Sequence, residues 1–139
     1  MASAVAFKLI TPTEIVFEGE AELVIATGTE GEEGILAHHA PFLTALRPGV
    51  LRANVSGSSG QTSRLELATS EGFMQALPDR VTVIVDQALR FEDVDVVQTR
   101  QQLSEALERQ AHVAAQSPEF AREQSAIDFA NAKLRLTGH

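Results

Sequence analysis

The stretch GTEGEEGILAHHAPFLTALRPGVLR, residues 28–52, holds the strongest structural signals in this chain of 139 residues. It opens with an acidic segment between glycines, continues through a His-His-Ala-Pro loop, and ends in an apolar run interrupted by a Pro-Gly pair. Proline fixes φ and glycine tolerates positive φ, so this pair predicts a tight turn. We therefore expect a turn over residues 28–34 and two strands, 42–47 and 50–55, joined at the Pro-Gly pair.

Short apolar runs with a period of two continue on both sides of this stretch. A Gly/Ser-rich segment at residues 56–63 predicts an exposed, mobile loop tip. Many short strands spaced by about 8–12 residues are typical of an antiparallel sandwich or barrel. Besides the two strands above, we expect strands at residues 5–9, 14–17, 22–27, 65–69, 72–77 and 80–88, with Gly19 separating the second from the third.

The chain changes character near residue 91. Glycine is absent from there until Gly138, and Ala, Gln, Glu and Leu dominate, which favours helices over strands. Asp93 is expected to cap a first helix, with Asp95 in its first turn. The apolar face of this helix is expected to contain Val96, Leu103, Leu107, Ala111 and Ala114.

A second helix is predicted after the Ser-Pro-Glu sequence at residues 117–119. Serine caps, proline suits the first helical position, and glutamate favours the positive end of a helix. Phe120, Ile127 and Leu134 then recur every seven residues, with Ala130 beside them. A break of two or three residues between the helices predicts an antiparallel hairpin.

The two halves together define the expected fold class, which is mainly β plus α. An N-terminal antiparallel β-sandwich domain is expected over residues 1–88, and a C-terminal two-helix hairpin domain over residues 89–139. An Ala-rich helix face allows close approach of another element. The hairpin therefore suits either its own sandwich or a partner helix, and the residue pattern leaves both open.

Composition excludes several classes of function. The chain has no Cys, so no disulfide or thiolate metal site can form. A formal net charge of −8 and the absence of Trp and Tyr argue against nucleic-acid binding, which uses clustered cations and stacking platforms. No stretch approaches the roughly 18 apolar residues of a membrane helix, and the first residues do not resemble a signal peptide. We therefore expect no nucleic-acid partner and no direct membrane insertion.

The residues that could carry chemistry do not form a catalytic pattern. His38 and His39 with Glu30, Glu32 and Glu33 have the wrong spacing for the helical His-Glu-x-x-His zinc site. Adjacent side chains of an extended segment also point in opposite directions. No serine sits in a Gly-x-Ser-x-Gly elbow, and no phosphate-binding glycine motif is present. The sequence thus predicts no catalytic residue, no metal and no cofactor.

The order and spacing of several segments are more specific than any one of them. These segments are residues 27–35, 39–46 and 47–49, and a second block that runs from 71–77 to 81–86. Together they resemble the epsilon subunit family of F-type ATP synthase, over nearly the full chain and with no gap through residue 52. The resemblance implies an N-terminal β-sandwich and a C-terminal helical hairpin. It also implies a non-catalytic component of the rotating central stalk.

The resemblance further implies partners. The sandwich would link the gamma subunit to the membrane c-ring and so couple proton flow to ATP synthesis. The hairpin would reach the catalytic alpha and beta subunits and regulate ATP hydrolysis weakly. The c-ring-facing loops of the family correspond to residues 28–34 and 37–41, and Glu30, Glu32 and His39 are the implied c-ring contacts; gamma contacts are not assigned. The complex would place this chain peripherally on the cytoplasmic face of the bacterial inner membrane.

The chain departs from the family pattern at two places. ATP-binding members have an Ile/Leu-Asp-x-x-Arg-Ala motif at the start of the first helix, where this chain keeps Asp95 but has Gln98 and Thr99. Glutamine cannot supply the phosphate-pairing charge of arginine, so no nucleotide-binding residue is expected. In the second helix the charges cancel, which predicts weak steering into an acidic catalytic groove. These charges are Glu119, Glu123 and Asp128 against Arg122, Lys133 and Arg135.

Two alternatives from other functional classes stay open. One is a free-standing β-sandwich module with a helical tail that binds another soluble protein. The other is a small hydrolase that uses His39 with a carboxylate, or Asp86 and the acidic segment as paired carboxylates. Copurification with gamma and the c-ring separates the first alternative from a rotor subunit, and activity of the isolated chain tests the second.

Overall fold

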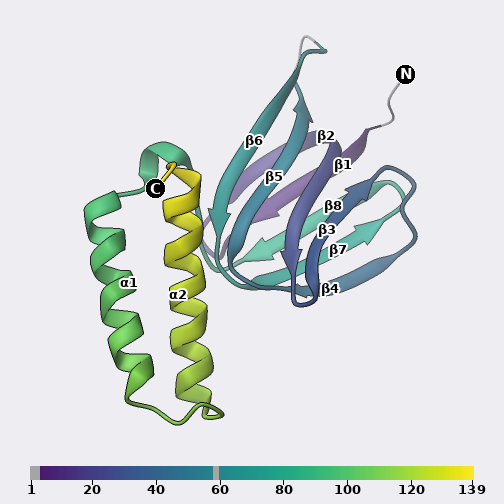
Figure 1. Ribbon diagram of the computed structural model, residues 1–139. Coiled ribbons are helices and arrows are strands. Elements are labelled where there is room, and N and C mark those ends of the chain that lie inside the picture. Colours follow the sequence, from purple (N-terminus) through teal and green to yellow (C-terminus); the bar gives the residue numbers. More distant parts are fainter. Residues whose placement is uncertain (1–3, 58–59) are drawn as a thin grey trace.

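The computed structural model describes residues 4–57 and 60–139 and shows strands followed by two helices (Figure 1). This confirms the predicted fold class. The strands are β1 (Val5–Ile10), β2 (Ile15–Gly28), β3 (Gly31–Leu36), β4 (Phe42–Leu46), β5 (Gly49–Ser56), β6 (Thr62–Thr69), β7 (Gly72–Leu77), β8 (Arg80–Val85) and β9 (Ala88–Leu89). A 3-10 turn, η1 (Phe91–Asp93), precedes α1 (Val96–Ala111) and α2 (Pro118–Leu136).

The strands form two layers joined through β2. One layer has the order β1-β8-β7-β4, and the other contains β3, β2, β5, β6 and β9. Strand β2 has 14 residues; it pairs with β1 over Ile15–Ala21 and with β3 over Leu23–Gly28. All pairings in these layers are antiparallel except the one between β1 and β8, which is parallel.

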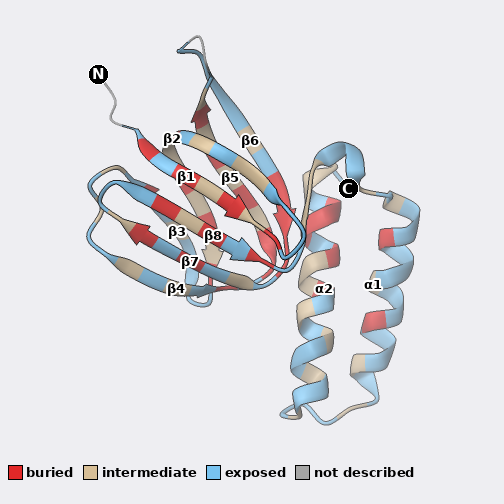
Figure 2. Cartoon of the chain, turned by 180° about the vertical axis from the view of Figure 1, so that it is seen from behind, coloured by how far each residue is buried: buried red, intermediate tan, exposed pale blue. Residues whose placement is uncertain are grey.

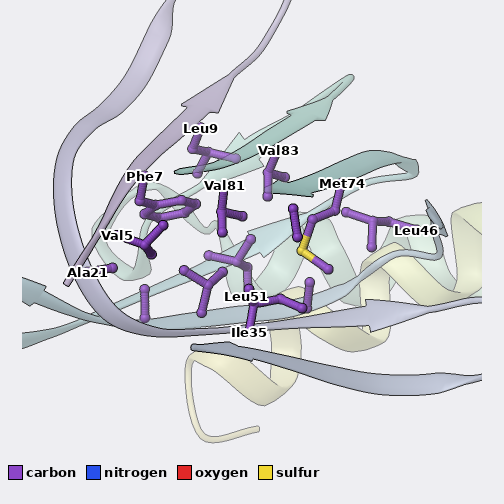
Figure 3. Close-up of a cluster of buried hydrophobic side chains, with 14 of the residues drawn as sticks. Val5, Phe7, Leu9, Ala21, Ile35, Leu46, Leu51, Met74, Val81 and Val83 are labelled. Atoms are coloured by element: carbon purple, nitrogen blue, oxygen red, sulfur yellow. The ribbon is translucent and has the colours of Figure 1, made fainter. Parts of the chain in front are cut away.

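The core lies between the layers and follows the alternation of the strands. In β1 the side chains of Val5, Phe7 and Leu9 are buried, while their neighbours face outward. Figure 3 shows these three with Val81 and Met74, which point into the same apolar cluster from the neighbouring strands. Because successive side chains of a strand alternate between faces, the odd-numbered residues of β1 and β8 fix which face of this layer is the core.

Two strand predictions were wrong. Gly19 does not separate two strands, because β2 continues through it and pairs Gly19 with Phe7. The Phe17 ring covers the site of the missing side chain, with Cζ 3.0 Å from the position of a Cβ at Gly19, so an aromatic neighbour compensates for the glycine. Residues 28–34 are not one turn either: only two residues, Thr29 and Glu30, lie between β2 and β3.

Two further boundaries differ from the expectation. The strand predicted at residues 80–88 ends at Val85, and Ala88–Leu89 forms the separate strand β9, which pairs with β6. The loop tip predicted at residues 56–63 is shorter, because β5 includes Ser56 and β6 begins at Thr62. Residues 58 and 59 of that prediction lie outside the described part of the chain.

The N-terminus of α1 is capped two residues later than predicted. Asp93 lies in η1, and Asp95 is the cap: its Oδ1 accepts a hydrogen bond from the Gln98 N–H at 3.0 Å. The predicted apolar face is also displaced, since Leu107 and Ala111 are exposed. The buried positions of α1 are Thr99 and Ala106. The face is set by packing against α2, which overrides the apolar pattern.

The start of α2 is confirmed, but the connection before it differs from the prediction. Ser117 caps this helix by accepting a hydrogen bond from the Phe120 N–H at 3.1 Å, and Pro118 is its first residue. Ile127, Ala130 and Leu134 are buried, whereas Phe120 is only partly buried. The connection between the helices spans residues 112–117 and is longer than the two or three residues expected.

The hairpin packs on its own sandwich. Helix α2 contacts β5 and β6, and α1 packs on the far side of α2 (Figure 1). Burial in α2 is concentrated in its C-terminal half, next to the sheet, as Figure 2 shows. Side-chain bonds also join the helices, including Arg109 Nε to Glu123 Oε2 at 2.9 Å; this hydrogen bond lowers the pKa of Glu123. The proposed domain boundary at residues 88/89 falls inside β9 and stays a prediction.

Within the described residues, neither helix is long and apolar enough to cross a membrane.

Candidate functional site

Strand β3 connects all three residues that the resemblance assigns to the c-ring. Glu30 lies in the two-residue turn before β3, Glu32 lies in the strand, and His39 lies in the loop after it. Within the described residues, β3 pairs with β2 alone, so its other edge has backbone groups without a strand partner there. At about 3.3 Å per residue, the two ends of this six-residue strand are roughly 17 Å apart. The three side chains therefore lie along one edge and do not form a single cluster.

The Glu32 end of β3 is next to the helical hairpin. The Arg52 guanidinium on β5 donates a hydrogen bond to Glu32 Oε2 across β2. An open cavity of about 860 Å³ lies beside this pair, with Arg47 from the sandwich and Arg135 from α2 among its lining residues. The ion pair is partly exposed, so it is worth less than about 1 kcal/mol and leaves Glu32 able to exchange partners.

The His39 end of β3 is a tightly held loop. His38 has a φ of 66°, and its N–H donates a hydrogen bond to the Pro78 carbonyl oxygen at 2.8 Å. His39 Nδ1 lies 2.8 Å from the Ala40 carbonyl oxygen, and its ring centroid is 5.9 Å from that of Phe42. The two histidines therefore serve different local roles and do not converge on one ligand.

The carboxylates of the acidic segment are separated in the same way. Glu30 is exposed in the turn, while Glu33 is partly buried opposite Ala26 in the β2–β3 ladder. Asp86 is exposed in the bend after β8, far along the chain from this segment. Among the residues that the structure describes, no group of three acidic or histidine side chains is arranged to hold a metal ion.

A row of apolar side chains crosses the outer face of the β1-β8-β7-β4 layer. Ala45 pairs with Phe73, Phe73 with Ile84, and Ile84 with Ile10, so these residues lie side by side on four strands. Phe73 is 59% exposed and Ile84 is 51% exposed; Leu43 on β4 is 69% exposed. Contiguous exposed apolar surface marks an interaction site more often than isolated apolar residues do. We call these five residues the apolar row.

The sequence analysis assigned no function to the apolar row. The alternation of β7 and β8 does contain a sign of it. Met74 and Val83 point into the core, and the adjacent apolar residues Phe73 and Ile84 point to the opposite face. The rest of the outward phase is mixed, because it includes Gln75 on β7 and Arg80 and Thr82 on β8. The exposed apolar surface is therefore confined to the row itself.

The start of α1 uses its polar residues for the helix itself. The Asp95 carboxylate caps the helix through the Gln98 N–H, and Thr99 Oγ1 donates to the Asp95 carbonyl oxygen at 2.6 Å. Thr99 is 2% exposed. The two residues that depart from the ATP-binding motif are therefore an exposed glutamine and a buried threonine.

The sandwich matches a known family. The family model described as "ATP synthase, Delta/Epsilon chain, beta-sandwich domain" matches residues 4–91, more than half of the chain. The chain belongs to the ATP synthase delta/epsilon chain family. The match extends beyond the sandwich: the ATP synthase epsilon chain of Syntrophobacter fumaroxidans is 35% identical over 136 residues, which cover 98% of this chain and 97% of that one.

Solved ATP synthase structures share the fold of this epsilon family member. One chain of the Euglena gracilis mitochondrial ATP synthase, OSCP/F1/c-ring, aligns with a TM-score of 0.75 at 21% identity and covers 98% of this chain and 82% of that chain. A chain of the Tetrahymena thermophila mitochondrial ATP synthase, central stalk/c-ring, aligns with a TM-score of 0.62 at 15% identity and covers 97% of both. At these identities the similarity concerns the fold.

Proposed function

We propose that this epsilon family member is a non-catalytic subunit of the central stalk of an F-type ATP synthase. In this role it would link the gamma subunit to the c-ring and so couple proton flow to ATP synthesis. The observation that carries the proposal is the match to the Syntrophobacter fumaroxidans epsilon chain over almost the whole of both chains. The fold it shares with chains of c-ring-containing assemblies supports the same role.

The apolar row is the surface that we assign to gamma. Phe73, Ile84 and Leu43 leave a broad apolar face in water, on a layer whose other face is the core. Burial of such a face gains roughly 25 cal/mol per Å² before the costs of association, so a permanent partner would stabilise it. A stalk subunit that stays bound through rotation requires an interface of this apolar kind.

The edge of β3 is the surface that we assign to the c-ring. Glu30 and Glu32 at one end and His39 at the other flank a strand edge with unpaired backbone groups. Polar and charged contacts of this type set register and orientation more than affinity. The apolar row would thus hold the subunit in the stalk, and the β3 edge would fix its position on the ring.

The hairpin is the part that we assign to weak regulation of ATP hydrolysis by contact with alpha and beta subunits. In the described structure it is docked on β5 and β6, and its charges are largely paired or balanced. The subunit itself would lie peripherally on the membrane, on the cytoplasmic face of a bacterial inner membrane, as part of the complex.

A pull-down from native membranes tests the proposal. The full chain should copurify with gamma and the c-ring. Phe73→Ser combined with Ile84→Ser should release gamma, and the combination of Glu30→Ala, Glu32→Ala and His39→Ala should weaken c-ring attachment while the thermal midpoint stays unchanged. Thr82→Ser, on the same face in the next row, is the matched control. Recovery of the chain without gamma and the c-ring would contradict the proposal and favour a free-standing binding module.

A further inference from the structure

His38 has a left-handed backbone conformation, which is uncommon for a residue with a Cβ. It is the one non-glycine residue with positive φ in the part of the chain that the structure describes, at 66°. Its side chain is exposed, so packing of the imidazole does not hold it there. A left-handed conformation costs free energy for any residue with a Cβ and persists only when surrounding structure enforces it.

The enforcing contact is a backbone tether to another loop. The His38 N–H donates to the Pro78 carbonyl oxygen at 2.8 Å, which ties the β3–β4 loop to the β7–β8 turn. That turn is tied in its own right, because the Ala6 N–H donates to the Asp79 carbonyl oxygen at 3.1 Å. His38 is therefore attached through the β7–β8 turn to the β1-β8-β7 layer. This attachment fixes the direction of the β3–β4 loop.

The next residue, His39, has a defined tautomer. Its Nδ1 lies 2.8 Å from the Ala40 carbonyl oxygen, and a carbonyl oxygen can only accept, so Nδ1 carries a proton. In the neutral imidazole, Nε2 is then an acceptor. Nε2 makes no hydrogen bond within residues 4–57 and 60–139. The Phe42 ring beside the imidazole limits the directions in which Nε2 can point.

We propose that His38 is a positioning residue whose tethered left-handed backbone directs His39 Nε2 toward a hydrogen-bond donor on the c-ring. This inference rests on the proposed function, because it takes His39 as a ring contact. It adds the chemistry of the contact: for the neutral imidazole, the partner group is an N–H or O–H donor on a polar loop of the ring.

Substitutions at His38 test the positioning role in complexes reconstituted with c-ring membranes at pH 8. Glycine adopts positive φ without strain, and asparagine tolerates it, so His38→Gly and His38→Asn should keep retention of the chain within about twofold of the unmodified value. A β-branched residue disfavours this conformation, so His38→Val should lower retention by about tenfold. Thermal unfolding of each variant establishes that folded molecules are compared. Equal retention of the valine and glycine variants would overturn the positioning role.

Substitutions at His39 test the acceptor and separate this inference from the proposed function. Glutamine places an oxygen near the position of Nε2, whereas asparagine is too short to reach it. His39→Gln should therefore keep most of the retention, and His39→Asn should lose as much as His39→Ala. Full retention of His39→Ala would defeat the ring contact itself. Loss with His39→Ala but equal loss with His39→Gln and His39→Asn would defeat only the acceptor assignment.

Discussion

Gly72 has no Cβ, and this allows the backbones of β7 and β8 to approach closely at this position. A Cβ at this position would collide with the Ile84 carbonyl oxygen and lie 2.8 Å from the Val85 Cα, and backbone cannot move aside as a side chain can. We expect Gly72→Ala to lower the free energy of unfolding by about 1–3 kcal/mol, as overpacking does. Urea denaturation measures it. Gly34→Ala is the control, since its Cβ would meet Leu23 Cδ1 at an ordinary 3.7 Å. Equal effects of the two changes would contradict the expectation.

Lys133 is a buried lysine between the two helices. Its Nζ donates to Gln102 Oε1 at 2.9 Å and lies 4.7 Å from the centroid of the Phe129 ring. Burial lowers the pKa of Lys133 from the ordinary 10.5, so the unfolded chain holds this proton more tightly than the folded chain. The resulting loss of stability is fully present below the folded-state pKa of Lys133. It disappears as pH rises from the folded-state pKa through 10.5.

The stability of the chain should therefore rise with pH in the alkaline range, and Lys133→Met should remove this rise. Urea unfolding at a series of pH values up to 11 measures it. The chain suits this experiment because it has no Tyr or Cys, and Lys8 is the one other lysine. Lys8→Met is the matched control and should keep the rise. A rise of equal size in the Lys133→Met variant would assign it to another group.

Gln98 occupies the position at which ATP-binding relatives are expected to have arginine. We expect the isolated chain to bind ATP weakly, and Gln98→Arg to raise the affinity by about ten- to a hundredfold, because a charge-assisted hydrogen bond is worth roughly 1.5–3 kcal/mol. Calorimetry on the free chain measures both, with Gln101→Arg on the same exposed helix as control. Micromolar binding by the unmodified chain would mean that other cations, such as Arg90, Arg100 or Arg122, replace the missing charge.

At the scale of elements, the C-terminal half of α2 holds the hairpin on the sandwich. Leu134 is 9% exposed and lines the cavity beside β5. Leu134→Ala should weaken docking by about 2 kcal/mol, the low end for a buried leucine. Amide hydrogen exchange should show faster exchange in α2 and unchanged protection in the core strands. Leu107→Ala is the control, because Leu107 is 49% exposed on α1. Faster exchange throughout the sandwich would instead indicate one cooperative unit.

The elements show where sequence reasoning succeeds and where it fails. Alternation located the core strands, and the Ser117-Pro118 signal located the start of α2, because both depend on local physics. The break predicted at Gly19 failed, since a ring two residues away compensates for that glycine. The prediction of the buried face of α1 was wrong, because contact with α2 determines that face. Thr99 is buried there, whereas Leu107 is exposed.

The site was harder to predict than the fold for a related reason. Family resemblance supplied Glu30, Glu32 and His39, but only the register of β3 shows that they lie along one edge. The apolar row depends on pairings between β4, β7 and β8, which no single segment reveals. The left-handed conformation of His38 could not be anticipated, because histidine adopts it more often than most residues but still only rarely.

At the scale of the whole molecule, the sandwich has a core of its own. The main buried apolar cluster contains residues from the strands and none from α1 or α2. Deletion of residues 91–139 should therefore leave a folded sandwich that still assembles, which circular dichroism and copurification can measure. This deletion retains β9 and the hydrogen bond from Arg90 Nη2 to the Val16 carbonyl oxygen at 3.1 Å.

The same deletion should raise ATP hydrolysis by the complex only about twofold or less, because the balanced charge of α2 gives little long-range attraction to acidic loops. Hydrolysis rates of complexes with full-length and truncated chains, at matched subunit content and two salt concentrations, measure this. A large activation that is insensitive to salt would mean that Phe120, Ile127 and Leu134 hold an inhibitory state by apolar contacts.

Strand β2 has a mechanical consequence for a rotating subunit. Its first half is hydrogen-bonded to β1 in one layer, and its second half to β3 and β5 in the other. A twisting load applied at the apolar row can thus reach the β3 edge along one covalent backbone and its ladders, without relying on side chains that slide over each other. Covalent bonds and hydrogen-bonded ladders fix the relative direction of the strands, whereas apolar contacts are non-directional. In the proposed stalk role, the sandwich should therefore transmit torque as a torsionally stiff coupling, and we expect elastic compliance to lie outside it.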